Sequence, residues 1–163
     1  MRPVPEYDAK SWLLKALRET GHAMEALLWN VDDDVSLHRQ PSADEWSCAE
    51  LVAHMSAMER RFLDRLERIV RLDDPRITAF DADSIGPCEP LSVYEAIDDL
   101  TELRSRTVHL LWSLDDGDWR RKGVHPYLGP LTILQVAREM NEHDLAHLWQ
   151  LRRLCDQMSA ASV

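Results

Sequence analysis

The segment TILQVAREMNEHDLAHLWQLRRLCDQM (residues 132–158) carries the periodicity that decides the fold. Its apolar residues recur at the three-and-four spacing of one helix face: Ile133, Val136, Met140, Leu151 and Leu154. Between Met140 and Leu151, the same sector is occupied by His143 and His147, four residues apart. The segment is therefore predicted to be an amphipathic helix whose inward face carries two imidazoles among aliphatic side chains.

Three upstream stretches show the same helical periodicity, at residues 8–29, 47–70 and 92–114. The segments 47–70 and 92–114 begin at S/T-x-x-E/Q sequences, and so does the last helix. In such a sequence, each side chain can form a hydrogen bond with the other residue's free backbone N–H. These capping boxes are Ser47 with Glu50, Ser92 with Glu95, and Thr132 with Gln135. Four amphipathic helices predict an all-α fold, a four-helix bundle, in a single domain over residues 1–163.

The connecting segments contain acids, prolines and glycines that are typical of loops. Residues 30–46 are expected to be a connector with a short turn of helix, and residues 71–91 a long loop. Residues 115–131 form the last loop. The sequence shows no convincing strand, but these loops leave room for a short strand pair.

Composition narrows the class of protein. The chain has a net charge of −10, which disfavours binding to nucleic acid or to an anionic membrane surface. No apolar run reaches the roughly eighteen residues that a membrane span needs, and the N-terminus lacks an apolar signal core. Cys48, Cys88 and Cys155 are scattered and odd in number, so we interpret them as reduced thiols of a cytoplasmic protein.

The spacing of His143 and His147 indicates a metal site. Two imidazoles one turn apart on a helix face can hold a single cation, and His54 lies near the edge of the apolar stripe of segment 47–70, where it can supply a third ligand. Three histidines and one open position are typical of a catalytic metal centre, and neutral imidazole suits zinc, nickel, copper or iron. The alternative is that the histidines are core residues bonded to a carbonyl or a carboxylate.

The sequence H-D-L-A-H (residues 143–147) also resembles the HExxH motif of metalloproteases, with Asp144 in place of the glutamate. Such enzymes usually take a third ligand from further along the chain. After His147 the sequence contains neither Glu nor His. A third ligand is therefore expected from upstream, as a bundle requires.

Two stretches resemble the DinB-like, YfiT-type metalloenzyme family. Residues 46–66, WSCAELVAHMSAMERRFLDRL, are similar to its W-S-x-x-E-x-x-x-H segment. Residues 123–154, GVHPYLGPLTILQVAREMNEHDLAHLWQLRRL, are similar to its second signature, a loop with glycine and proline, a threonine-capped helix, and H-x-x-x-H followed by glutamine. The resemblance implies a four-helix bundle in which His54, His143 and His147 hold a divalent metal.

The resemblance also implies a range of activities. Some relatives are S-transferases that use low-molecular-weight thiols such as bacillithiol or mycothiol, others resemble maleylpyruvate isomerases, and relatives often form homodimers. We therefore expect a divalent metal, zinc or nickel first, as cofactor, with a low-molecular-weight thiol as an optional second one. A small-molecule substrate and a homodimer are expected as partners.

Two further residues are candidates for the site. Glu50 lies one turn before His54 and is interpreted either as a capping residue only, or as a base or an acceptor that orients His54. Arg104 falls in the apolar sector of segment 92–114, and a buried guanidinium needs a partner. We expect a salt bridge to an acid on a neighbouring helix, or snorkelling; the functional alternative is an anchor for an anionic substrate.

The remaining histidines and two aromatic residues are interpreted as structural. Core packing is expected for His109, Trp112 and Tyr127, with a pocket wall as the alternative, and solvation is expected for His22, His38 and His125.

The sequence predicts a metal-dependent thiol S-transferase or a hydrolase acting on a small molecule. The alternative is a non-catalytic bundle in which the ion stabilises the fold or serves storage or sensing, which a fourth ligand from Cys48 or Glu50 would favour. A third hypothesis is a metal-free bundle used for protein contacts.

Overall fold

The computed structural model describes residues 6–31, 34–79 and 92–161; Cys88 lies outside them. Four long helices form the bundle: α1 (Glu6–Trp29), α3 (Cys48–Arg71), α4 (Val93–Ser113) and α5 (Ile133–Ala161). Their bounds agree with the predicted segments to within a few residues. The all-α prediction and the four-helix bundle are confirmed. None of the described helices is long and apolar enough to cross a bilayer.

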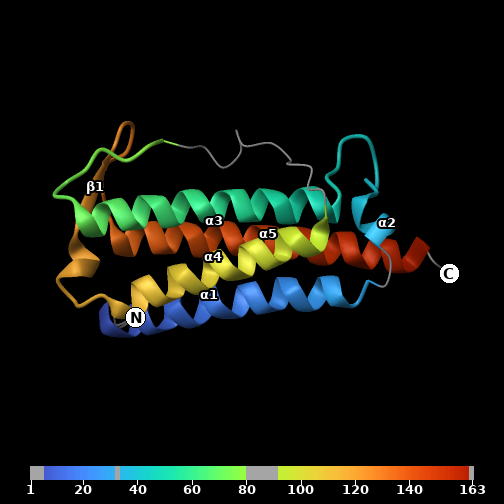
Figure 1. Ribbon diagram of the computed structural model, residues 1–163, viewed down its shortest axis with the longest axis horizontal. Helices are drawn as coiled ribbons and strands as arrows, with labels where there is room; N and C mark the ends of the chain where they lie inside the picture. Colours follow the sequence, from blue (N-terminus) through green and yellow to red (C-terminus); the bar gives the residue numbers. More distant parts are fainter. Residues whose placement is uncertain (1–5, 32–33, 80–91, 162–163) are drawn as a thin grey trace, which may run out of the picture.

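The long helices surround the core in the cyclic order α1, α4, α3, α5. Helix α3 packs against α4 and α5, and α1 packs against the same two helices from the other side. The pair α3/α5 thus forms one long edge of the bundle, and the pair α1/α4 forms the opposite edge (Figure 1).

Three of the four long helices begin where the capping signals predict. At Ser47, the hydroxyl accepts from the N–H of Glu50, and the Glu50 carboxylate accepts from the N–H of Ser47 at 2.7 Å. Thr132 and Gln135 make the same reciprocal pair. At Ser92, the hydroxyl accepts from the N–H of Glu95. Local hydrogen bonds that the sequence encodes therefore fix the start of the helices that carry the histidines.

The loops contain short regular elements. Residues 30–46 include helix α2 (Asp34–His38), as predicted, and residues 115–131 include a 3-10 turn, η2 (Asp118–Arg120). The strand pair for which the sequence left room is a hairpin of β1 (Lys122–His125) and β2 (Gly129–Thr132), paired antiparallel with Lys122 opposite Thr132. Gly129 has a φ of 74°, the left-handed conformation that favours glycine at the end of a short hairpin loop.

The hairpin is anchored on α3 through a close approach at Gly123. A Cβ atom there would lie 2.6 Å from Ile77 Cγ2 and 2.9 Å from Ile69 Cγ1, so only glycine fits without displacing its neighbours. The segment that follows α3 also holds the hairpin in place, because Val124 N–H donates to the Pro75 carbonyl at 2.8 Å. Since β2 runs directly into α5, this contact positions the start of the helix that carries His143 and His147.

Two apolar clusters form the core of the described residues. One lies toward the α2 end and is built from residues such as Leu51, Leu100 and Leu151, whereas the other lies toward the hairpin and includes Leu17, Leu66 and Ile133. Buried polar side chains lie where the two clusters meet. Thr20, Arg104, Thr107 and Asp144 lie between the clusters in their helix sequences, and His54 and Glu59 lie next to Met55 and Met58, where the clusters meet on α3.

Candidate metal centre

The three predicted ligands come together at the α3/α5 edge. One ligand atom from each of His54, His143 and His147 lies within 4.8 Å of the other two. The ring centroids are 5.5 Å apart for His54 and His143, 4.9 Å for His54 and His147, and 4.4 Å for His143 and His147. Residues 89 positions apart in the sequence thus supply one compact group of imidazoles.

The spacing of the nitrogens fits a metal ion. The Nε2 atoms of His54 and His143 face each other at 3.3 Å. Two nitrogens that each lie about 2.05 Å from a tetrahedral zinc ion are separated by about 3.3 Å. Among the described residues, this group contains histidines only, without a carboxylate or a thiol. The donor set therefore suits zinc, nickel, copper or iron and leaves a coordination position for a further ligand.

The orientation of His147 is fixed by a residue that the sequence analysis did not single out as a site residue. The Gln150 side-chain oxygen lies 2.9 Å from His147 Nδ1. Because an amide oxygen only accepts, Nδ1 carries the proton and Nε2 keeps its lone pair. A hydrogen bond of this kind is the usual support of a metal-binding histidine. The sequence spacing could have predicted this contact, since Gln150 follows His147 by three residues, almost one helical turn.

Aromatic side chains line the group. The Trp46 ring packs edge-on against His54, with centroids 5.0 Å apart, and stacks with His147 at 6.3 Å and an interplanar angle of 15°. Phe62 contacts His143 edge-on at 6.0 Å. His54 is only 1% exposed, whereas His143 and His147 are half-buried. The group is therefore shielded on its inner side and reaches solvent along α5.

Electrostatics keep His143 neutral. Burial lowers the pKa of His143 to about 3, and the neighbouring His147, His54 and Arg104 act in the same direction. A neutral imidazole is the form that binds metal, so this ring has its lone pair available at physiological pH.

The family model of the DinB superfamily matches residues 16–151 of the chain, a range that includes all three histidines. The chain belongs to the DinB superfamily. The family prediction is thereby confirmed.

The chain is also similar to individual proteins. OB0413 of Oceanobacillus iheyensis, which its name assigns provisionally to the metal-dependent hydrolases, is 25% identical over 146 residues, or 86% of this chain and 83% of that protein. YfiT from Bacillus subtilis, described provisionally as a metal-dependent hydrolase with an unusual four-helix bundle topology, has a TM-score of 0.82 at 18% identity over 98% of this chain and 93% of YfiT. TT2238, a four-helix bundle protein, gives 0.66 at 22% identity over 88% of this chain and 98% of its own.

Arg104 is the centre of a buried polar network in this DinB bundle. Its Nε and Nη2 donate to the two oxygens of Glu59 at 3.0 and 2.8 Å. Its Nη1 and Nη2 donate to the two oxygens of Asp144 at 2.7 and 3.0 Å, and Nη1 also donates to the Leu17 carbonyl at 2.6 Å. All five N–H groups of the guanidinium therefore have acceptors within the protein.

The network joins all four long helices. Thr20 of α1 donates to Asp144 at 2.9 Å, and Thr107 of α4 donates to Glu59 at 2.6 Å. Burial by itself would lower the pKa of Arg104, but the two carboxylates more than offset this and the pKa is raised. We call these five residues the Arg104 network: Thr20, Glu59, Arg104, Thr107 and Asp144.

The hydrogen-bond partners of Arg104 favour one of its two interpretations. The predicted salt bridge to acids on neighbouring helices is present, at 2.8 Å to Glu59 and 2.7 Å to Asp144. The alternative, an anchor for an anionic substrate, is disfavoured by these contacts, because every N–H group already has a protein acceptor. Asp144, which the sequence placed at the glutamate position of a metalloprotease motif, is one of those acceptors.

The Glu50 carboxylate already has hydrogen-bond partners at the start of α3. Its carboxylate accepts from the N–H of Ser47 and from the side chain of Gln40 at 3.1 and 3.2 Å. These contacts support the interpretation of Glu50 as a capping residue over a role as a base.

Expectations about burial were wrong for four residues. His109, Trp112 and Tyr127 are exposed, the last two to 73% and 85%, although core packing was expected. His125, expected to be solvated, is buried because its Nδ1 accepts from the N–H groups of Tyr127 and Leu128 and so closes the hairpin loop. Cys48 and Cys155 are buried free thiols.

Replacement of Arg104 should destabilise the fold strongly. In Arg104→Met, the carboxylates of Glu59 and Asp144 stay buried without their partner, so we expect the free energy of unfolding to fall by about 3–5 kcal/mol in urea titrations. Arg60→Met is the control, because its ion pair with Asp99 is exposed and should contribute no more than about 1 kcal/mol. Equal losses in the two variants would contradict the central role of the Arg104 network.

Glu50→Gln tests the capping role. A glutamine oxygen can replace the carboxylate in a capping box, so we expect the zinc dissociation constant to change by less than about threefold. If Glu50 instead oriented His54, affinity would fall by about 10- to 100-fold. Ser47→Ala is the matched variant, which should cost about 1 kcal/mol of stability through the lost cap.

Proposed function

We propose that this DinB protein is a metal-dependent hydrolase of a small-molecule substrate, with zinc or nickel held by His54, His143 and His147. The observation that supports this most directly is the convergence of the three ligand atoms within 4.8 Å. The reaction class is supported by OB0413 and YfiT, both described provisionally as metal-dependent hydrolases.

A divalent cation with three protein ligands supplies an open position in which the pKa of a water or a thiol is lowered toward neutrality. The residues of this chain provide the setting for that chemistry. Gln150 holds His147 in the tautomer that directs Nε2 to the group, and Trp46 and Phe62 cover the rings with apolar surface. The half-buried His143 and His147 leave a side from which a substrate can approach.

A purely structural metal site would need a fourth protein ligand, and the two candidates are otherwise engaged. Contact with Cys155 and burial raise the pKa of the Cys48 thiol, which disfavours the thiolate that binds metal. Glu50 caps α3. Both observations support an open position and hence catalysis over the non-catalytic alternative.

Loss of a single histidine should abolish stoichiometric metal. For His54→Ala, His143→Ala and His147→Ala, we expect the bound zinc or nickel per chain to fall from about one to near zero, because two imidazoles alone bind weakly. Elemental analysis of untagged protein measures this. His109→Ala is the control, since His109 is exposed on α4 and should leave metal content unchanged. Full metal content in His147→Ala would contradict the assignment.

Activity assays of the zinc- or nickel-bound protein distinguish the reaction classes. A hydrolase releases product from activated esters or amides without added thiol, and the rate disappears in His147→Ala. A strict requirement for a low-molecular-weight thiol, with a stoichiometric thioether product, would instead show the S-transferase that the resemblance also implied. No turnover, together with a large loss of thermal stability on chelation, would favour the structural role.

A further inference from the structure

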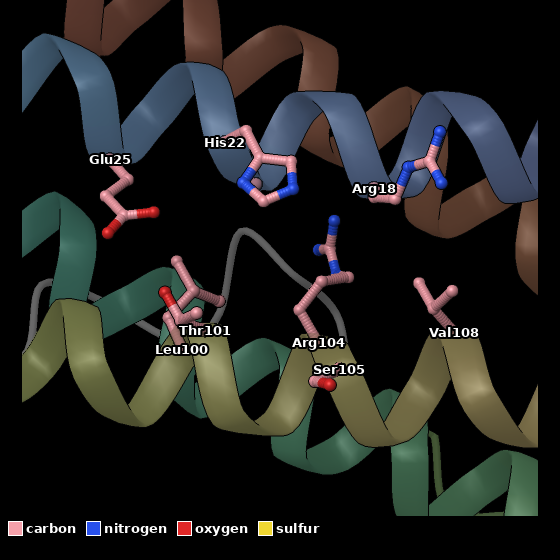
Figure 2. A pocket seen from close by; sticks show the side chains of 9 residues that line it. Arg18, His22, Glu25, Leu100, Thr101, Arg104, Ser105 and Val108 are labelled. Carbon is pink, nitrogen blue, oxygen red and sulfur yellow. The ribbon is translucent and has the colours of Figure 1, made fainter.

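A cavity of about 240 Å³ lies between α1 and α4, on the opposite side of the bundle from the histidines (Figure 2). Leu100 and Val108 of α4 line it, together with the aliphatic stem of Arg104. Protein cavities of about 150 Å³ can bind benzene, so this cavity has room for a molecule built on one aromatic ring. We call it the α1/α4 pocket.

The α1 wall of the pocket is open because it contains Gly21. A glycine inside a helix destabilises it relative to alanine, and Gly21 lies inside α1. Packing does not require glycine at this position, since a Cβ atom would lie 3.5 Å from Arg104 Cγ, an ordinary van der Waals distance. Glycine does, however, allow a ligand to approach the backbone closely. The residue therefore lowers helix stability and leaves a space that the fold itself does not need.

Side chains of opposite charge lie at the two ends of the pocket. Glu25 reaches from α1 into the gap at the Leu100 end, whereas Arg18 lies at the Val108 end (Figure 2). Within the described part of the chain, Arg18 forms no ion pair, and Glu25 accepts only a 3.4 Å hydrogen bond from the Trp29 indole. The two charged residues are seven positions apart, or about 10 Å along α1. A molecule with a positive and a negative end is complementary to both.

We propose that the α1/α4 pocket binds a small aromatic molecule that carries an amine at one end and a carboxylate at the other. The ring packs against Leu100 and Val108, in the space that Gly21 leaves open. The ammonium group donates to the Glu25 carboxylate, and the ligand's carboxylate accepts from the Arg18 guanidinium. Apolar walls with a few polar groups that fix orientation are the usual composition of a small-molecule site.

This site is separate from the candidate metal centre. Arg104 contributes its stem to the pocket, while its guanidinium is held by Glu59 and Asp144 in the bundle interior. The ligand contacts α1 and α4 only, and His143 and His147 lie on α5 at the other edge. The proposal therefore does not depend on the proposed hydrolase activity, and metal-free protein can be used to test it.

The probe is 4-(aminomethyl)benzoate, titrated into the metal-free protein and followed by amide NMR. We expect saturable shifts in residues 18–25 and 100–108, with a dissociation constant below about 1 mM. Benzoate and benzylamine each lack one of the two charges, so each should bind at least about threefold more weakly.

Three variants test the parts of the site separately. Gly21→Leu fills the pocket with a good helix former, so the dissociation constant should rise at least about tenfold while the thermal midpoint does not fall. Arg18→Gln should remove the advantage of the probe over benzylamine, and Glu25→Gln its advantage over benzoate. Arg152→Gln on α5, outside the pocket, is the control that should bind the probe as the wild type does.

The opposite results would overturn the proposal. These are no saturable shift up to about 5 mM probe, shifts confined to α3 and α5, or wild-type affinity in a Gly21→Leu variant whose circular dichroism is that of the wild type. If Gly21→Leu does not fold, the two charge variants decide, because both residues are on the surface: unchanged affinity in both would contradict the assigned contacts.

Discussion

The buried ion pairs of Arg104 constrain the bundle at its middle. A guanidinium excluded from water is stable only when its charge and all its N–H groups are satisfied. Here the acceptors come from three other helices: the Leu17 carbonyl of α1, Glu59 of α3 and Asp144 of α5. Each contact is within hydrogen-bond distance, so a shift of one helix along another would leave a buried charge unpaired. The apolar clusters on either side can tolerate small shifts far better, because dispersion contacts are not directional.

That constraint acts on the helices that carry the histidines. Glu59 follows His54 by five residues on α3, and Asp144 follows His143 directly on α5. Fixing the two carboxylates on one guanidinium therefore also fixes how α3 and α5 lie relative to each other. The capping boxes at Ser47 and Thr132 set where these helices start, and the Gly123 contact seats the hairpin that leads into α5. The ion pairs of Arg104, the capping boxes and the Gly123 contact together bring His54 and His143 to within 3.3 Å of each other.

Features encoded within one helical turn could be predicted from the sequence. The pair His143 and His147 and the capping boxes fall in this class, because residues three or four apart are neighbours on any α-helix. His54 required the bundle to bring α3 beside α5. The acceptors of Arg104 could not be identified, since the sequence contains many acids and only the packing selects Glu59 and Asp144. Trp112 and Tyr127 were misjudged because residue type favours burial, whereas their exposure depends on the helix face and the loop that carry them.

The most direct test of the account is X-ray absorption spectroscopy of the zinc-loaded protein at the zinc edge. Three imidazoles from α3 and α5 around one ion predict three histidine nitrogens and one or two further nitrogen or oxygen ligands, at about 2.0–2.1 Å and without sulfur. A zinc–sulfur distance of about 2.3 Å, or fewer than three imidazoles, would contradict the claim that His54, His143 and His147 share an ion with an open position.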